Sequence, residues 1–169
     1  MNAQTGFEKG TQEATRERLV VIGNGMAGCR AVEEILALAP DRYAITIFGA
    51  EPRVNYNRIM LSPVLAGEKS FDEIVINTSE WYEENSITLV SGDPVIHIDR
   101  EACQVVSRGG RIESYDKLLI ATGSDPFVIP VPGKDLPGVV AYRDRDDDET
   151  RQGCDGPAPV AHADGTPAR

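Results

Sequence analysis

Three glycines spaced as Gly-x-Gly-x-x-Gly, which are Gly23, Gly25 and Gly28, form the part of this sequence best suited to hold a ligand. The apolar run Leu-Val-Val-Ile ends directly before them, and a helical pattern follows directly after them. In this context the first glycine permits a tight turn out of a strand, the second lets the backbone approach a pyrophosphate, and the third lets the helix pack against the strand. The pattern predicts that a dinucleotide pyrophosphate lies at the helix N-terminus, beside Met26 and Ala27. The alternative is a glycine-rich turn in another kind of α/β protein.

An acidic residue that binds the ribose of an adenosine is expected roughly 20 residues after such glycines, at the end of the second strand. The expected strand ends at residue 48, and Glu51 is the nearest acid. We therefore expect Glu51 to bind the ribose, the alternative being a solvated carboxylate in a Glu-Pro turn. Arg53 follows closely in the sequence, so the choice between a ribose with and without a 2′-phosphate stays open.

The elements that must position these residues can be read from the apolar pattern. A strand at 18–22, a helix at 26–39 and a strand at 44–48 complete the β-α-β unit that a nucleotide-binding loop requires. Residues 53–65 look irregular, and the expected elements after them are a helix at 77–85, a strand at 87–90, an antiparallel meander at 94–98, 104–107 and 111–114, and a strand at 116–121. Because the last strand carries Leu118, Leu119 and Ile120 in a row, we expect it to be buried on both faces.

This pattern predicts an α/β fold, a Rossmann-like parallel sheet with a small antiparallel β-meander. Residues 18–143 are expected to form this domain, behind a flexible leader at 1–17. Residues 144–169 contain almost no large apolar side chain, so we expect a disordered tail there.

Composition excludes several classes of partner. The formal net charge of −10 argues against nucleic acid, which calls for a basic face. No apolar stretch approaches the roughly 20 residues that span a bilayer, and the first 17 residues lack the apolar core of a signal peptide, so the cytoplasm is the expected location. The three cysteines, Cys29, Cys103 and Cys154, have no metal-binding or dithiol spacing and are expected to be free thiols.

Four motifs together carry a family resemblance. They are Val-Ile-Gly-Asn-Gly-Met-Ala-Gly at 21–28, Phe-Gly-Ala-Glu-Pro at 48–52, Asn-Tyr-Asn-Arg with Leu-Ser at 55–62, and Tyr-Asp-Lys-Leu-Leu-Ile-Ala-Thr-Gly-Ser at 115–124. The chain resembles the pyridine nucleotide-disulfide oxidoreductase superfamily over about residues 18–143. Within it, the chain most resembles the N-terminal FAD-binding module of the large subunit of NAD(P)H-dependent nitrite reductase, so that residues 18–143 would be an incomplete FAD domain.

The resemblance implies roles for particular residues. The three glycines would accept the FAD pyrophosphate, and Glu51 would bind the adenosine ribose. Further residues would contact the flavin, its phosphates or the adenine: Arg58, Ser62, Val95, Ala121, Thr122 and Gly123. The alternatives are a surface arginine for Arg58 and a plain strand-end turn for Thr122 and Gly123.

The resemblance also implies a function in nitrate assimilation. In the intact enzymes of this family, a hydride passes from NAD(P)H to the flavin, and electrons continue to metal centres that reduce nitrite. The sequence carries no second Gly-x-Gly-x-x-Gly domain and no metal-binding cysteine cluster, so we expect this chain not to be competent alone. The alternatives are the FAD module of a rubredoxin or ferredoxin reductase, and an inert truncated or frameshifted nucleotide-binding product.

Overall fold

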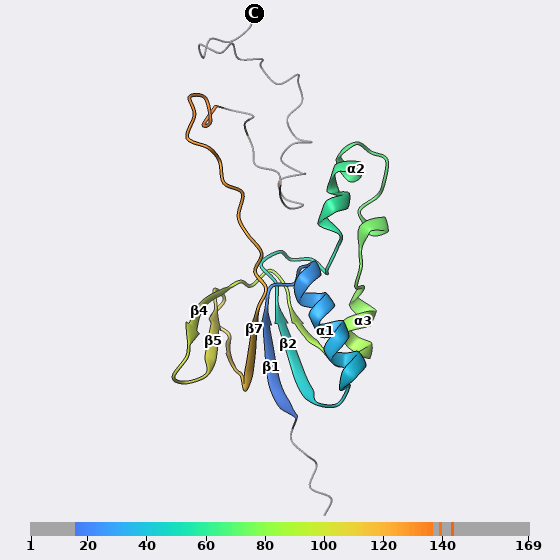
Figure 1. Ribbon diagram of the computed structural model, residues 1–169, viewed down its shortest axis with the longest axis vertical. Coiled ribbons are helices and arrows are strands. Elements are labelled where there is room, and N and C mark those ends of the chain that lie inside the picture. Colours follow the sequence, from blue (N-terminus) through green and yellow to red (C-terminus); the bar gives the residue numbers. More distant parts are fainter. Residues whose placement is uncertain (1–15, 137–138, 140–142, 144–169) are drawn as a thin grey trace, which may run out of the picture.

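The computed structural model describes residues 16–136, 139 and 143 of the chain (Figure 1). The expected leader and tail therefore lie almost entirely outside the described residues. The elements, in chain order, are β1 (Glu17–Ile22), α1 (Met26–Leu38), β2 (Tyr43–Phe48), the 3-10 turn η1 (Arg58–Met60), α2 (Leu61–Leu65), the 3-10 turn η2 (Asp72–Ile74), α3 (Ser79–Glu84), β3 (Thr88–Val90), β4 (Val95–Asp99), β5 (Gln104–Ser107), β6 (Ile112–Ser114) and β7 (Lys117–Ile120).

A four-stranded parallel sheet forms the centre of the fold, in the order β3-β2-β1-β7. Strand β1 lies inside this sheet, with β2 on one side and β7 on the other. Alternate residues of a strand face opposite sides of a sheet, so β1 buries Leu19 and Val21 on one face and Val20 and Ile22 on the other. The expectation of a Rossmann-like parallel sheet is confirmed.

Helices α1 and α3 cover one face of the parallel sheet (Figure 1). Val32 of α1 and Tyr82 of α3 pack there with Leu19 and Val21 of β1. Helix α1 ends one residue earlier than expected, with Ala39 as its C-cap directly before a proline. The helical face and the expected β-α-β unit therefore follow from the apolar spacing in the sequence.

The antiparallel sheet β4-β5-β6 covers the opposite face. Val105, at the centre of β5, is fully buried against Val20, Ile22 and Phe48. The side chain of Asp93 holds the β5–β6 hairpin in place, because it accepts hydrogen bonds from Ser107 Oγ at 2.6 Å and from the amide of Gly109 at 2.7 Å. The expected meander is thus present, and it forms the third layer of the domain.

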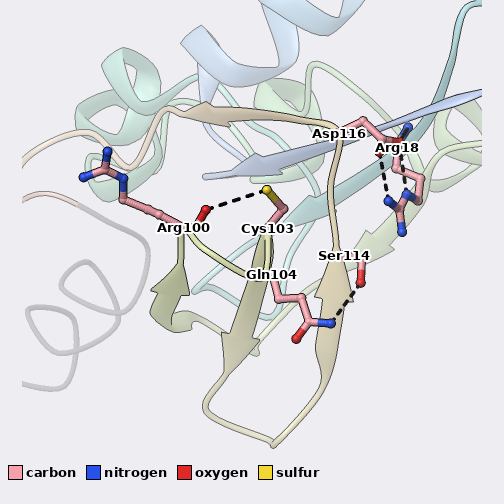
Figure 2. Close-up of polar contacts among 6 residues, drawn as sticks. All are labelled: Arg18, Arg100, Cys103, Gln104, Ser114 and Asp116. Atoms are coloured by element: carbon pink, nitrogen blue, oxygen red, sulfur yellow. Dashed lines mark hydrogen bonds and ion pairs between the residues drawn. The ribbon is translucent and has the colours of Figure 1, made fainter.

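Strand β7 differs from the expectation that it is buried on both faces. Within the described residues it pairs only with β1, so it lies at an edge of the sheet, and Ile120 is 60% exposed. Its start is fixed by Asp116, whose carboxylate accepts hydrogen bonds from the amide, Nε and Nη2 of Arg18 at 2.7, 3.0 and 2.9 Å (Figure 2). An uninterrupted apolar run is therefore not sufficient evidence that both faces of a strand are covered.

The segment after β2 also differs from the sequence-based expectation. Residues 53–65 looked irregular, yet they contain η1 and α2. The side chain of Asn57 caps η1 by accepting a hydrogen bond from the amide of Ile59 at 3.0 Å. Tyr56, Leu61 and Ile74 then bury their side chains in a small separate cluster. Helices this short have no amphipathic repeat that a sequence pattern could detect.

Among the described residues, no helix combines the length and the apolar character needed to cross a bilayer. The same part of the chain holds no group of three or more histidine, cysteine, aspartate or glutamate side chains placed to bind a metal ion.

Candidate functional site

Two of the three glycines of the motif pack closely against neighbouring backbone: Gly23, in the loop between β1 and α1, and Gly28, in the first turn of α1. Gly23 has φ +116°, and a Cβ atom there would lie 2.2 Å from the carbonyl oxygen of Ala121, at the end of β7. A Cβ atom at Gly28 would lie 2.5 Å from the carbonyl oxygen of Gly23. Larger side chains at these two positions would therefore push the loop away from the sheet and from the helix.

Gly25 differs from the other two glycines because its missing side chain leaves open space. No heavy atom lies within 4 Å of the position where its Cβ atom would be. Its backbone is extended, with φ −100° and ψ 177°, a conformation that any residue can adopt. The absence of a side chain at Gly25 is thus not required by the fold, and it gives a ligand access to the backbone.

Gly25 is the N-cap of α1, and the amide of Cys29 donates the first helical hydrogen bond to its carbonyl oxygen, at 3.0 Å. The amides of Met26 and Ala27, in the first turn, have no acceptor within the helix. The first turn carries no acidic side chain, so no carboxylate of the helix itself opposes an anion there. Open amides and the positive end of a helix dipole together form a site suited to phosphate.

A cleft of about 280 Å³ opens at this loop, at the carboxyl ends of the parallel strands. It brings together residues from the β1–α1 loop, the segment after β2, the start of β4 and the end of β7. Of the residues predicted from the sequence, those that line it are Gly23, Gly25, Met26, Ala27, Glu51, Arg58, Val95, Ala121, Thr122 and Gly123. Gly28 is buried beneath the loop, and Ser62 is exposed on α2, outside the lining of the cleft.

The carboxylate of Glu51 is held in place inside the cleft. The hydroxyl of Tyr56 donates a hydrogen bond to Oε2 of Glu51 at 2.6 Å, and Nη2 of Arg58 forms an ion pair with Oε1. The side chain of Glu51 is only 16% exposed, so solvent screens these contacts less than it would at an open surface. Arg58 therefore contacts Glu51 directly, a partnership that the sequence did not indicate.

Tyr56 lies inside the motif at 55–62, but no pattern in the sequence identifies it as a site residue. Its side chain is 4% exposed, and its ring packs against Phe71 with 5.1 Å between ring centroids. A buried tyrosine needs a partner for its hydroxyl, and here that partner is Glu51.

A second group of polar side chains lies below the glycine loop. Oδ1 of Asn24 accepts hydrogen bonds from the Tyr82 hydroxyl at 2.8 Å and from the Cys29 thiol at 3.2 Å. Nδ2 of Asn24 donates to the carbonyl oxygen of Arg53 at 3.1 Å. The Tyr82 hydroxyl in turn accepts a hydrogen bond from the amide of Asn55 at 3.3 Å. These contacts link the loop to α3 and to the segment after β2.

Two side chains in that group, Cys29 and Tyr82, can ionise, and burial raises the pKa of both. Desolvation raises the pKa of the Cys29 thiol to about 11, so the thiol stays protonated and donates a hydrogen bond. Desolvation, followed by the influence of Cys29, also raises the pKa of Tyr82. Both groups are therefore neutral hydrogen-bonding groups at physiological pH.

The chain is similar in sequence and in structure to known proteins. The family described as pyridine nucleotide-disulphide oxidoreductase matches residues 17–155. Nitrite reductase [NAD(P)H] of Bacillus subtilis is 52% identical to the chain over 135 residues, which are 80% of this chain and 17% of that protein. The assimilatory nitrate reductase electron transfer subunit of the same organism is 50% identical over 132 residues, which are 78% of this chain and 17% of that protein.

A solved structure has the same fold. The crystal structure of NADH:rubredoxin oxidoreductase from Clostridium acetobutylicum superimposes with a TM-score of 0.71 at 30% sequence identity, covering 82% of this chain and 36% of that one. The chain therefore spans only a small part of the length of each of these relatives.

Proposed function

The chain belongs to the pyridine nucleotide-disulphide oxidoreductase family, and from this premise we propose that it is the FAD-binding part of an NAD(P)H-dependent nitrite reductase. The observation that carries the proposal is the cleft at the glycine loop, where Gly25 leaves backbone amides open to a diphosphate. The 52% identity to a nitrite reductase supports the choice within the family. The chain covers 17% of that relative, so the activity of a whole enzyme is part of the proposal.

The residues present suit the adenosine diphosphate half of FAD. The open space at Gly25 fits a diphosphate, because a side chain at this position would fill the space that the ligand needs. The amides of Met26 and Ala27 supply hydrogen-bond donors, and Glu51 supplies a carboxylate for the ribose hydroxyls. A volume of about 280 Å³ is close to the lower limit of about 300 Å³ for small-molecule sites, which suits part of a dinucleotide better than all of it.

The remaining roles are proposed in the same way. Val95 lines the cleft, and its backbone would contact the adenine, while Ala121, Thr122 and Gly123 border the cleft at the end of β7, where ligands bind in open α/β sheets. For Arg58, the contact with Glu51 supports a role in orienting that carboxylate. Ser62 stays a prediction that no contact in the described residues supports.

When bound, FAD supplies the ability to accept a hydride from a nicotinamide and to release electrons one at a time. The part of this chain in that reaction is to bind and orient the cofactor. We propose that the chain alone does not reduce nitrite, and that the nicotinamide and metal sites belong to other domains or chains. We also propose a cytoplasmic location.

Two other electron-transfer functions have specific support. The 50% identity to an assimilatory nitrate reductase electron transfer subunit favours transfer of electrons to nitrate reductase. The likeness to NADH:rubredoxin oxidoreductase favours a small iron–sulfur protein as the acceptor. Both functions require the proposed FAD site, and they differ only in the protein that receives the electrons.

The test is purification of the full 169-residue chain, followed by titration with FAD and measurement of visible flavin absorbance in the protein fraction. We expect weak or substoichiometric FAD binding and no NADH-driven reduction of nitrite. Complete absence of FAD binding would reject the FAD site and favour an inert product. Stable one-to-one FAD binding together with nitrite reduction by the pure chain would show that it is competent alone.

A further inference from the structure

The second group of polar side chains, which lies below the glycine loop, joins two segments that form the cleft. One segment is the loop that contains Gly25, and the other is the stretch 51–55, which begins with Glu51. Asn24 connects them directly, because its Nδ2 donates to the carbonyl oxygen of Arg53 at 3.1 Å. Tyr82 connects them a second time, because its hydroxyl donates to Asn24 Oδ1 at 2.8 Å and accepts from the amide of Asn55 at 3.3 Å.

These hydrogen bonds use almost all the capacity of the two side chains. The Tyr82 hydroxyl has one hydrogen, which Asn24 accepts, and one of its lone pairs receives the amide of Asn55. Oδ1 of Asn24 receives a second hydrogen bond, from the Cys29 thiol at 3.2 Å. This pattern fixes the orientation of the Asn24 amide, because reversing it would place its NH₂ against the tyrosine donor and its oxygen against the carbonyl of Arg53.

Packing restricts the same two side chains. Tyr82 is 3% exposed and packs in the core below α1. Gly49, directly after β2, approaches Asn24 so closely that a Cβ atom on Gly49 would lie 3.0 Å from that of Asn24. The position of the Asn24 side chain between the two segments is therefore restricted by packing as well as by hydrogen bonds.

We propose that Asn24 and Tyr82 are positioning residues that fix the spacing between the diphosphate-binding amides and the carboxylate of Glu51. This inference rests on the function proposed above, in which the ligand is the adenosine diphosphate half of FAD, whose ribose and diphosphate must engage both segments at once. A ligand that engages only one segment gains nothing from a fixed distance between them. A ligand that engages both gains from the preorganised site, because less conformational ordering is needed on binding.

The test compares three ligands on the full chain. ADP engages both segments, adenosine engages only the ribose end, and inorganic pyrophosphate engages only the amides. The variants are Tyr82→Phe, which removes the bridging hydroxyl, and Asn24→Ser, which removes the donor to Arg53. Tyr115→Phe is a matched control, because the Tyr115 hydroxyl donates to the carbonyl oxygen of Asp99 at 3.5 Å, in the layer of β4 and β5. Affinities are measured by titration of ¹⁵N-labelled protein, with a thermal melt of each variant.

We expect Tyr82→Phe and Asn24→Ser each to weaken ADP binding by about ten-fold, while the affinities for adenosine and pyrophosphate change by less than about three-fold. Tyr115→Phe should match the wild type for all three ligands. Should Tyr82→Phe fail to fold, the half-buried Asn24→Ser variant decides the question. Parallel losses for all three ligands, or ADP binding equal to that of the wild type, would overturn the positioning role. Failure of the wild type to bind ADP would instead reject the proposed function, and this inference with it.

Discussion

A single methyl group at Gly25 should separate the stability of the chain from its affinity for a diphosphate. The Cβ atom of Gly25→Ala would meet no heavy atom within 4 Å, and φ −100° with ψ 177° is allowed for alanine. Replacing glycine by alanine at a compatible position reduces the conformational freedom of the unfolded chain and stabilises a protein by about 0.4–1 kcal/mol. Gly25 is also the N-cap of α1, where alanine is less favourable than glycine by about 0.5–1 kcal/mol. The two effects nearly cancel, so the variant should be about as stable as the wild type.

The same substitution should weaken the affinity for a diphosphate. The methyl group would occupy the open space through which a diphosphate reaches the amides of Met26 and Ala27. Loss of one hydrogen bond to a charged group, about 1.5–3 kcal/mol, corresponds to roughly 10- to 150-fold weaker binding. Gly28→Ala gives the contrasting result, because its Cβ atom would lie 2.5 Å from the carbonyl oxygen of Gly23 and the helix would have to move. That variant should lose stability, by about 1–3 kcal/mol.

The assay combines urea unfolding of each variant with calorimetric titration of ADP into the folded protein. The reasoning would be refuted by a Gly25→Ala variant that binds ADP as tightly as the wild type. It would also be refuted by a Gly25→Ala variant that unfolds as easily as Gly28→Ala, because the open space at Gly25 would then be filled by the fold itself.

Three further predictions concern the sheet and the ribose end of the cleft. Hydrogen bonds from Arg18 hold the pKa of Asp116 well below its usual range. These bonds therefore stabilise the fold fully above the unfolded-state pKa of about 3.9, and their contribution is lost as the pH falls toward the folded-state pKa. The stability advantage of the wild type over Asp116→Asn in urea unfolding should therefore be constant near neutral pH and shrink below about pH 4; an advantage that grows on acidification would contradict this. Ile47→Ala, at a fully buried position of β2, should cost about 2–5 kcal/mol in the same assay, whereas Ile59→Ala, at a side chain 76% exposed, should change stability by less than about 0.5 kcal/mol; equal losses would contradict the assigned core. Glu51→Gln should weaken adenosine and ADP by about ten-fold without changing pyrophosphate binding, because a carboxylate is the stronger acceptor for ribose hydroxyls, and an unchanged affinity for adenosine would remove Glu51 from the ribose site.

The β-α-β unit could be predicted from the sequence because each of its signals is local. The apolar residues of β1 and β2 and the helical spacing of α1 are each contained in a short window. The positive φ of Gly23 and the close approach of Gly28 to the carbonyl oxygen of Gly23 are likewise local, whereas the contact of Gly23 with Ala121 joins residues far apart in the chain. Most of the predicted cleft residues lie together because the carboxyl ends of parallel strands meet at one edge of the sheet.

The parts that could not be predicted depend on contacts between distant residues. Asn24 and Tyr82 are 58 positions apart, and no local pattern indicates that their side chains meet. The exposure of Ile120 depends on which strands pair with β7, which an apolar run does not reveal. The partnership of Arg58 with Glu51 depends on the turn that η1 and its Asn57 cap introduce, and no periodic pattern of residues marks that turn.

In the proposed function, backbone amides of the glycine loop bind the diphosphate of FAD. The most direct measurement is a backbone amide spectrum of the ¹⁵N-labelled chain, recorded during titration with FAD and, in parallel, with adenosine. We expect saturable shifts of the amides of Gly25, Met26 and Ala27 with FAD, and much smaller shifts of the same amides with adenosine. Saturable FAD binding that leaves these three amides unchanged would contradict this proposal.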